Sequence, residues 1–208
     1  MKLLRVDSSA RRNSVSKHLT QHFAQTWKEE HPEGQVIERD LSLTHLPPIT
    51  DEWTLAAHTD PAGRTPEQAK VLAVSDALIE ELRQADVIVI GAPMYNFSSP
   101  ASLKAWIDQI VRAGETVVFG AAGPQGLLKN KKAVVISSRG GAYRPGTPTE
   151  GFDFQEPYLR HILAFVGITD VTFIYAENQK PGPQAEVAKA AAIALIGQVA
   201  ADSVSAAN

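Results

Sequence analysis

The amino-acid sequence predicts an α/β fold, in which helices cover both faces of a doubly wound, five-stranded parallel sheet. Val87, Ile88, Val89 and Ile90 form an unbroken β-branched run, which is typical of a strand buried on both faces of a parallel sheet. Further short strand-like stretches alternate with longer ones whose apolar residues follow helical spacing. Five alternations of strand and helix favour right-handed crossovers and a parallel sheet.

The expected elements begin and end at recognisable signals. Strands are expected over residues 2–6, 35–39, 87–90, 132–137 and 171–175. Asn13 or Ser14 caps a helix over 15–30, and Pro66 opens one over 66–85. Pro100 opens a helix that runs to 111, and Gly167 closes one over 156–166. Residues 184–201 predict the last helix, 51–58 a short one, and the Gly-rich segment 114–128 a hairpin or a flap.

Length and composition limit the classes of function. The 208 residues predict a single domain over 1–208, with a net charge of −3 and no basic surplus for nucleic acid. Cysteine is absent, which excludes disulfides, thiol catalysis and thiolate metal sites. No apolar run approaches the roughly 18 residues of a membrane span. Because the first residues read as a strand rather than a signal peptide, we expect a cytoplasmic location and no membrane partner.

The loop after the first strand chooses between the two common orders of such a sheet. A dinucleotide-binding fold would carry G-x-G-x-x-G there, but residues 7–16 contain no glycine. The flavodoxin type, with strand order 2-1-3-4-5, is therefore expected. Ser9, Ser14 and Ser16 lie where the first helix begins, and a helix N-terminus with added hydroxyls suits a phosphate. The alternative is that Ser14 only caps the helix.

Two further loops follow buried strands. Tyr95, Asn96 and Phe97 offer either a platform for a planar ring or an ordinary packed loop. The next loop, 138–141, contains two glycines that let the backbone approach a ligand, or it is a plain tight turn. In the order 2-1-3-4-5 all three loops meet at the topological switch point. A ligand with one phosphate and a flat polar ring fits them together, which indicates flavin mononucleotide (FMN).

Other kinds of site are not expected. His18 and His22 have the i, i+4 spacing of metal ligands, but no third ligand is evident, so no metal is predicted. There is no G-x-S-x-G elbow and no phosphate-binding G-x-x-x-x-G-K-[ST] loop.

Over nearly its whole length the chain resembles the FMN-dependent NADH:quinone oxidoreductases of the bacterial azoreductase type. The resemblance rests on four motifs, namely Ser8-Ser9 with Ser14-Val15-Ser16, Pro93-Met94-Tyr95-Asn96-Phe97, Ser138-Arg139-Gly140-Gly141, and Gly167-Ile168-Thr169-Asp170-Val171. It implies a flavodoxin-like fold, non-covalent FMN, and a homodimer with two active sites at the subunit interface. The implied activity is ping-pong, two-electron reduction of quinones and reductive cleavage of aromatic azo compounds, with NADH or NADPH as donor.

The resemblance also assigns residues to the cofactor. Ser9, Ser14, Val15 and Ser16 would hold the phosphate and ribityl chain. Met94, Tyr95, Asn96 and Phe97 would lie along the isoalloxazine ring, and Ser138, Arg139, Gly140 and Gly141 would meet its pyrimidine edge. The flavin would carry the chemistry, so no protein acid or base is required. Asn96 and Tyr143 are the candidates for a catalytic contribution.

Two functions of other classes remain open at this point. A flavodoxin-like electron carrier would bind FMN without a substrate pocket, and a non-catalytic flavin-binding module would not turn over at all. Carriers of this fold are typically shorter and strongly acidic, whereas this chain has a charge of only −3 and a long irregular connection over 40–66.

Overall fold

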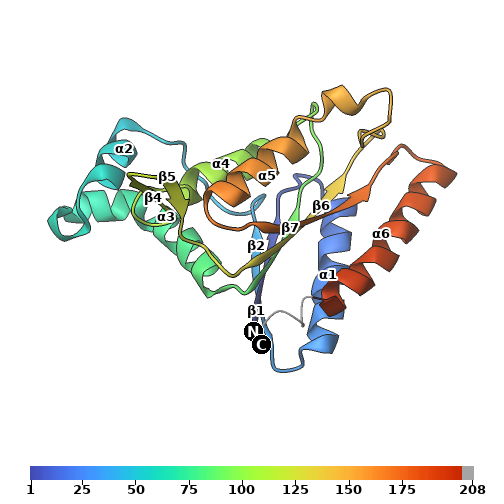
Figure 1. Ribbon diagram of the computed structural model, residues 1–208, viewed down its shortest axis with the longest axis horizontal. Coiled ribbons are helices and arrows are strands. Elements are labelled where there is room, and N and C mark those ends of the chain that lie inside the picture. The colour runs from blue at the N-terminus through green and yellow to red at the C-terminus, as the bar shows by residue number, and fades with distance from the viewer. Residues whose placement is uncertain (203–208) are drawn as a thin grey trace.

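The computed structural model describes residues 1–202, and its centre is a five-stranded parallel sheet (Figure 1). The strands are β1 (Lys2–Asp7), β2 (Gln35–Asp40), β3 (Val87–Gly91), β6 (Lys132–Ser138) and β7 (Asp170–Ala176). Their order across the sheet is β2-β1-β3-β6-β7. The predicted order was 2-1-3-4-5, and it counted only the strands of this sheet. The observed numbers differ at the last two positions because two more strands, β4 and β5, lie in the chain between β3 and β6. The last six residues of the predicted domain 1–208 lie outside the described residues.

Helices cover both faces of the sheet. On one face lie α1 (Val15–Glu30) and α6 (Pro183–Asp202), side by side at the right of Figure 1. The other face carries α3 (Pro66–Gln84), α4 (Ala101–Ile110) and α5 (Gln155–Phe165). The short helix α2 (Asp51–His58) packs on α3, away from the sheet. A doubly wound arrangement, as predicted, is therefore present.

The period-2 pattern of the buried strands divides the core into two clusters. In β3, Ile88 and Ile90 point to the cluster under α3, α4 and α5, whereas Val87 and Val89 point to the cluster under α1 and α6. All four side chains are at most 1% exposed. This explains why the central strand is apolar without alternation, since water reaches neither face.

The Gly-rich segment forms a hairpin that is separate from the main sheet. Strands β4 (Val117–Gly120) and β5 (Gly123–Gly126) pair antiparallel. The hairpin is tied to the end of α5 by the Leu128 N–H, which donates to the Val166 carbonyl at 2.8 Å. A Cβ on Gly126 would overlap backbone atoms of Val166 and Gly167, so the two segments are packed as closely as their backbones allow.

The predicted helices are all present, with ends that differ by at most two residues. For α1 and α2 the predicted and observed bounds are the same, because Ser14 and Thr50 cap them through hydrogen bonds from the backbone three residues on. Two 3-10 turns, Pro61–Gly63 and Glu150–Phe152, complete the elements. Within residues 1–202, no helix combines the length and the apolar character that a membrane crossing requires.

Candidate functional site

The loops that follow β1, β3 and β6 meet at the carboxyl edge of the sheet, where they enclose a cavity of about 170 Å³. The residues that line it come from all three loops and from the segment after β7. They are Ser9, Arg11, Ser14, Val15, Pro93, Met94, Tyr95, Ser138, Arg139, Gly140 and Gln179. We call this space the loop cavity.

The N-terminus of α1 forms one end of the loop cavity. Ser14 is the N-cap, and its hydroxyl accepts from the Lys17 N–H at 3.3 Å and lies 3.0 Å from the Ser16 hydroxyl. The first backbone N–H groups of a helix have no partner inside the helix and carry partial positive charge. The first turn of α1 holds no acidic residue, and Arg11 lines the same cavity. This end of the cavity is therefore suited to an anion.

The loop after β3 contains a strained turn. Tyr95 and Ser98 exchange backbone hydrogen bonds of 2.9 and 3.0 Å, and between them Asn96 and Phe97 have φ of 49° and 67°. Positive φ at both central positions is the type I′ pattern, which asparagine tolerates and a phenylalanine rarely adopts. The turn thus presents Phe97 at the surface at an energetic cost, as strained segments at binding sites do.

Hydrogen bonds join the three loops directly. The Met94 N–H donates to the Ser138 carbonyl at 2.9 Å, which connects the second and third loops. The Tyr95 and Ser9 hydroxyls lie 3.4 Å apart, which connects the second and first. The segment after β7 supports the third loop from behind, since the Gln179 N–H donates to the Arg139 carbonyl at 2.9 Å. Beside it, a Cβ on Gly140 would meet nothing within 4 Å, so a ligand has access to that backbone.

The Arg139 side chain is fully buried among acidic groups behind the third loop. Its Nε donates to the Ser137 hydroxyl at 2.9 Å, and its Nη1 forms an ion pair with Asp153 Oδ2 at 2.7 Å. Glu177 and Glu156 lie farther away, each with an oxygen 3.9 Å from a terminal nitrogen. The guanidinium also lies over the Tyr175 ring, 4.8 Å from its centroid. The side chain therefore fixes the protein scaffold behind the third loop.

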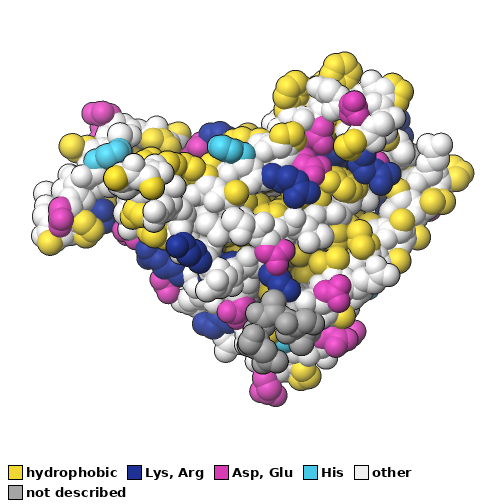
Figure 2. Space-filling model, in the orientation of Figure 1, with side chains coloured by type: hydrophobic (Ala, Val, Ile, Leu, Met, Phe, Trp, Pro, Cys, Tyr) yellow, Lys and Arg dark blue, Asp and Glu magenta, His cyan; other side chains and the backbone are white. Residues whose placement is uncertain are grey.

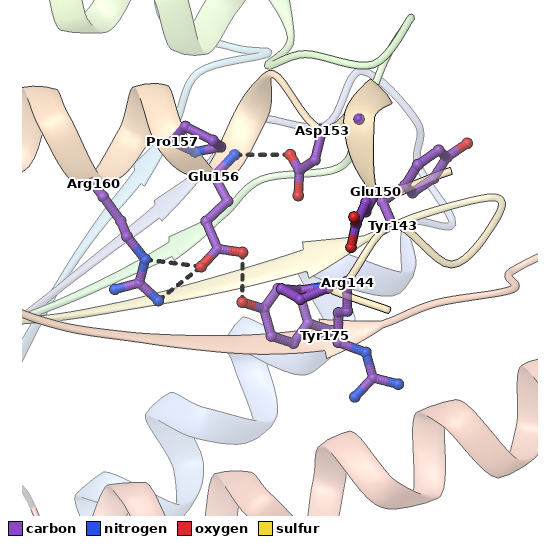
Figure 3. Close-up of a pocket in the computed structure, with 10 residues that line it drawn as sticks. Tyr143, Arg144, Glu150, Asp153, Glu156, Pro157, Arg160 and Tyr175 are labelled. Atoms are coloured by element: carbon purple, nitrogen blue, oxygen red, sulfur yellow. Dashed lines mark hydrogen bonds and ion pairs between the residues drawn. The ribbon is translucent and has the colours of Figure 1, made fainter. Parts of the chain in front are cut away.

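A second and larger cavity, about 630 Å³, lies between the 143–153 segment and α5 (Figure 3). Four of the charged side chains that line it are already paired: Glu156 with Arg160 inside the cavity, and Asp153 and Arg144 with Arg139 and Glu177, which do not line it. Arg160 pairs with Glu156 at 2.8 Å, and Glu156 also accepts from the Tyr175 hydroxyl at 2.6 Å. Burial and the hydrogen bond to Glu156 raise the pKa of Tyr175 to about 12, so this phenol stays protonated throughout the physiological range.

Asp7, at the end of β1, is the buried acid nearest the first loop. Burial raises the pKa of its carboxyl, although the Thr20 hydroxyl donates to it at 2.5 Å and Arg5 lies 3.1 Å away. The side chain is 2% exposed. Asp7 holds α1 to β1 through Thr20, and it does not line the loop cavity.

The structure brings most of the sequence-predicted residues together. Those that line the loop cavity are Ser9, Ser14, Val15, Met94, Tyr95, Ser138, Arg139 and Gly140. Ser16, Asn96, Phe97 and Gly141 do not line it, because Ser16 lies inside the first turn of α1, Asn96 and Phe97 project at the turn, and Gly141 follows beyond Gly140. Tyr143 lies against Phe97, with ring centroids 6.1 Å apart.

Several site residues were not predicted from the sequence. Arg11 and Gln179 line the loop cavity, and Gln155 and Glu177 support its loops from behind. Gln155 alone carried a usable signal. It precedes Leu159 and Leu163 by four and eight positions, which places a polar side chain on the buried face of α5.

The surface beside the site is unusually aromatic. Phe97, Phe152 and Phe154 are 45%, 52% and 62% exposed, and the first two rings lie 5.4 Å apart. Figure 2 shows hydrophobic side chains gathered on the projecting lobe at its upper right, which the segment around the 3-10 turn Glu150–Phe152 forms in Figure 1. We call these three residues the aromatic patch. Exposed groups of large apolar side chains mark interaction surfaces.

His18 and His22 lie along a separate cavity of about 400 Å³ between α1 and α6. In the described part of the chain, 1–202, no three histidine, aspartate or glutamate side chains are arranged to hold a metal ion. The two histidines thus have no third ligand among these residues.

The loop cavity fits a phosphate-bearing ligand better than a neutral one. Its donors are the free N–H groups of α1, the hydroxyls of Ser9 and Ser14, and the charge of Arg11. Its 170 Å³ is below the roughly 300–1,000 Å³ of a pocket that encloses a whole ligand of this size. A nucleotide bound with its phosphate at this end would therefore extend beyond the cavity.

Comparison with known proteins gives close relatives along most of the chain. Residues 1–199 match the model of a family described as having a flavodoxin-like fold. The FMN-dependent NADH:quinone oxidoreductase 1 of Trichormus variabilis is 52% identical over 185 residues, which are 88% of this chain and 87% of that protein. The FMN-dependent NADH:quinone oxidoreductase of Acidobacterium capsulatum is 49% identical over 174 residues, 84% of each chain.

Solved structures of azoreductases are also similar to this chain. An azoreductase from Bacillus anthracis superposes with a TM-score of 0.89 at 30% identity, and the match covers 97% of this chain and 99% of that one. An FMN-dependent NADH-azoreductase from the same species, solved in complex with FMN, gives a TM-score of 0.86 at 25% identity over 97% and 99% of the two chains.

Proposed function

Since the chain belongs to the flavodoxin-like family of FMN-dependent NADH:quinone oxidoreductases, we propose that it catalyses FMN-dependent oxidation of NADH with two-electron reduction of quinones and of aromatic azo compounds. The observation that carries the proposal is the loop cavity. It has an anion-binding helix terminus at one end and open glycine backbone at the other, and three strand-end loops build it.

Each loop has a distinct part in holding FMN. Ser9 and residues 14–16 would bind the phosphate and ribityl chain through hydroxyls and the N–H groups of α1. Residues 94–97 would lie along the isoalloxazine ring, and residues 138–141 would meet its pyrimidine edge. This assignment is supported by the way the loops converge and by their mutual hydrogen bonds.

When bound, FMN would supply the redox chemistry of a two-electron transfer from NADH to the acceptor. The protein's contribution is to orient and to stabilise. The Arg139 backbone is held by the Ala176 carbonyl and the Gln179 N–H, and the N–H groups of Gly140 and Gly141 that follow it would be fixed donors for negative charge on the ring edge. Asn96 and Tyr143 remain the candidates for hydrogen bonding and proton delivery at the substrate side.

We also propose that the active unit is a homodimer with a site at each subunit interface, in the cytoplasm. A ring outside the loop cavity needs a cover, and the aromatic patch lies beside it. A second copy of this chain would exclude water from the ring and bury the three phenylalanines. Sedimentation of the FMN-loaded protein at micromolar concentration should therefore give twice the mass of the chain, and a monomer at that concentration contradicts the dimer.

Steady-state kinetics test the proposed function. The protein is purified with FMN, and initial rates of NADH oxidation are measured over a matrix of NADH and quinone concentrations. Because NADH and quinone would use the same ring face in turn, double-reciprocal plots should be parallel lines. Lines that intersect would show a ternary complex and contradict the single shared site.

The same measurement separates the enzyme from its rivals. An electron carrier would bind FMN but show no sustained NADH oxidation with quinone, and a binding module would show none with any acceptor. The sequence comparisons favour the enzyme. About half of the aligned residues are identical to those of named oxidoreductases, and the aligned parts cover more than four fifths of both chains.

A further inference from the structure

Gln155, the first residue of α5, is fully buried between the two loops that face the ring. Its amide nitrogen donates to the carbonyls of Ala92 and Pro93 at 3.2 and 3.1 Å and lies 3.4 Å from that of Ser98. These carbonyls flank the strained turn of the second loop. One amide group therefore closes the base of that turn.

The other end of the same amide binds the third loop. Gln155 Oε1 accepts from the Ser137 hydroxyl at 2.6 Å, and that hydroxyl accepts from Arg139 Nε at 2.9 Å. Three carbonyls on one side and a hydroxyl donor on the other fix which end is nitrogen and which is oxygen. The amide thus connects the second loop to the third through a continuous hydrogen-bonded chain.

The two residues before Gln155 also hold the second and third loops. The Phe154 N–H donates to the Phe97 carbonyl at 3.1 Å. Asp153 Oδ1 accepts from the backbone N–H groups of Gln155 and Glu156 at 3.0 Å, while its other oxygen pairs with Arg139. The amino end of α5 therefore contacts both loops at several points, and α5 packs against the sheet as a rigid element.

The strained turn needs such external support. Consecutive residues in the left-handed region persist only where surrounding contacts over-determine them. Asn96 and Phe97 are exposed, so their own side chains bury little that would hold them there. The contacts from 153–155 lie under the turn and supply that constraint.

We infer that Gln155 is a positioning residue that fixes the two ring-facing loops, 92–98 and 137–141, relative to each other and so sets both the affinity and the redox potential of bound FMN. This inference rests on the proposed function. Gln155 does not line the loop cavity, so it acts through the loop backbones rather than by touching the cofactor.

The test compares Gln155→Leu with a matched control, Gln109→Leu. Gln109 is also fully buried and also joins two segments, accepting from Trp53 Nε1 at 3.1 Å and donating to the Pro47 carbonyl at 2.9 Å. It lies in α4, and none of the cavities described above includes it. Both variants lose a buried amide, but only one loses the connection between the loops.

Two quantities are measured for each variant, the dissociation constant of FMN by fluorescence titration and the midpoint potential of the bound flavin. In Gln155→Leu, FMN affinity should fall about tenfold or more, because several buried hydrogen bonds at the loop bases are lost. The midpoint potential should shift as well. In Gln109→Leu both quantities should stay at wild-type values, although thermal stability falls.

Gln155→Glu provides an independent test if the leucine variant fails to fold. Burial and the three carbonyl oxygens would raise the pKa of a carboxyl at this position. The nearest cation, Arg139 beyond the Ser137 hydroxyl, is already neutralised by Asp153 at 2.7 Å. The protonated acid regains one donor. FMN binding by this variant should therefore be weaker at pH 8 than at pH 5.5. The ratio of the FMN dissociation constant at pH 8 to that at pH 5.5 should be about tenfold larger in the variant than in the wild type.

The outcomes separate the inference from the function on which it rests. If the wild type neither binds FMN nor oxidises NADH, the proposed function is wrong. If the wild type does both, but Gln155→Leu matches Gln109→Leu in affinity and potential, the positioning role is wrong. A pH ratio for Gln155→Glu equal to that of the wild type overturns it as well.

Discussion

Replacing Ser14 with aspartate should weaken FMN binding about a hundredfold or more while leaving the affinity for riboflavin nearly unchanged. Ser14 is the N-cap of α1 and lines the loop cavity. Aspartate is as good an N-cap as serine, so the helix should keep its start. Its charge would lie beside the proposed phosphate, and two unit charges about 5 Å apart at an effective dielectric constant of about 20 repel by roughly 3 kcal/mol.

Fluorescence titration of the apo-protein with FMN and with riboflavin measures the effect. Riboflavin lacks the phosphate and serves as the internal control for the ring-binding loops. Ser14→Asn is the matched variant, since asparagine caps a helix equally well without the charge. If Ser14→Asp weakens both ligands equally, or neither, then the phosphate does not lie at the N-terminus of α1.

Replacing Arg139 with methionine should lower the free energy of unfolding of the apo-protein by about 3–5 kcal/mol, the usual loss when one partner of a buried ion pair is removed. The guanidinium is fully buried, and Asp153 and Glu177 beside it are 10% and 4% exposed. Among residues 1–202, Asp153 has no other paired cation once Arg139 is removed, and Glu177 keeps Arg144 alone. Urea unfolding measures the loss.

Two further variants show whether the burial of the charge causes the effect. Arg160→Met removes an ion pair with Glu156 from an arginine that is 48% exposed, and it should lower the free energy of unfolding by less than about 1 kcal/mol. Adding Asp153→Asn to Arg139→Met should restore part of the lost free energy of unfolding. The asparagine amide oxygen can still accept from the Gln155 and Glu156 N–H groups, and no buried charge is left unpaired at this position. Equal losses for Arg139→Met and Arg160→Met would contradict the assignment.

The local signals of the sequence were sufficient to predict the elements and the meeting of the three loops at one edge of the sheet. A cap residue and apolar periodicity predicted α1 with its observed bounds. The apolar runs of the strands and the glycine and proline residues that end them predicted where the loops lie. The rule that ligands bind at the switch point then brought Ser14, Tyr95 and Gly140 together.

The parts that were missed depend on contacts between residues far apart in the chain. The sequence placed Gln155 at the end of a loop, and only the fold brings it against Ala92, more than sixty residues earlier. The direction of the Arg139 side chain likewise depends on Asp153 and Glu177, which approach from two different elements. The Gly-rich hairpin left two possibilities open, because its pairing is stabilised by packing on the end of α5 rather than by a strong local pattern.

The residues that line the loop cavity lie in segments 9–15, 93–95 and 138–140 and at position 179, so they span most of the chain. A nascent chain therefore cannot complete the loop cavity until nearly all of it has left the ribosome. For the finished chain, a ligand at a hundred times its dissociation constant adds about 2.7 kcal/mol to the folded state. Bound flavin would thus lower the fraction of unfolded chains open to proteolysis, in addition to making the protein active.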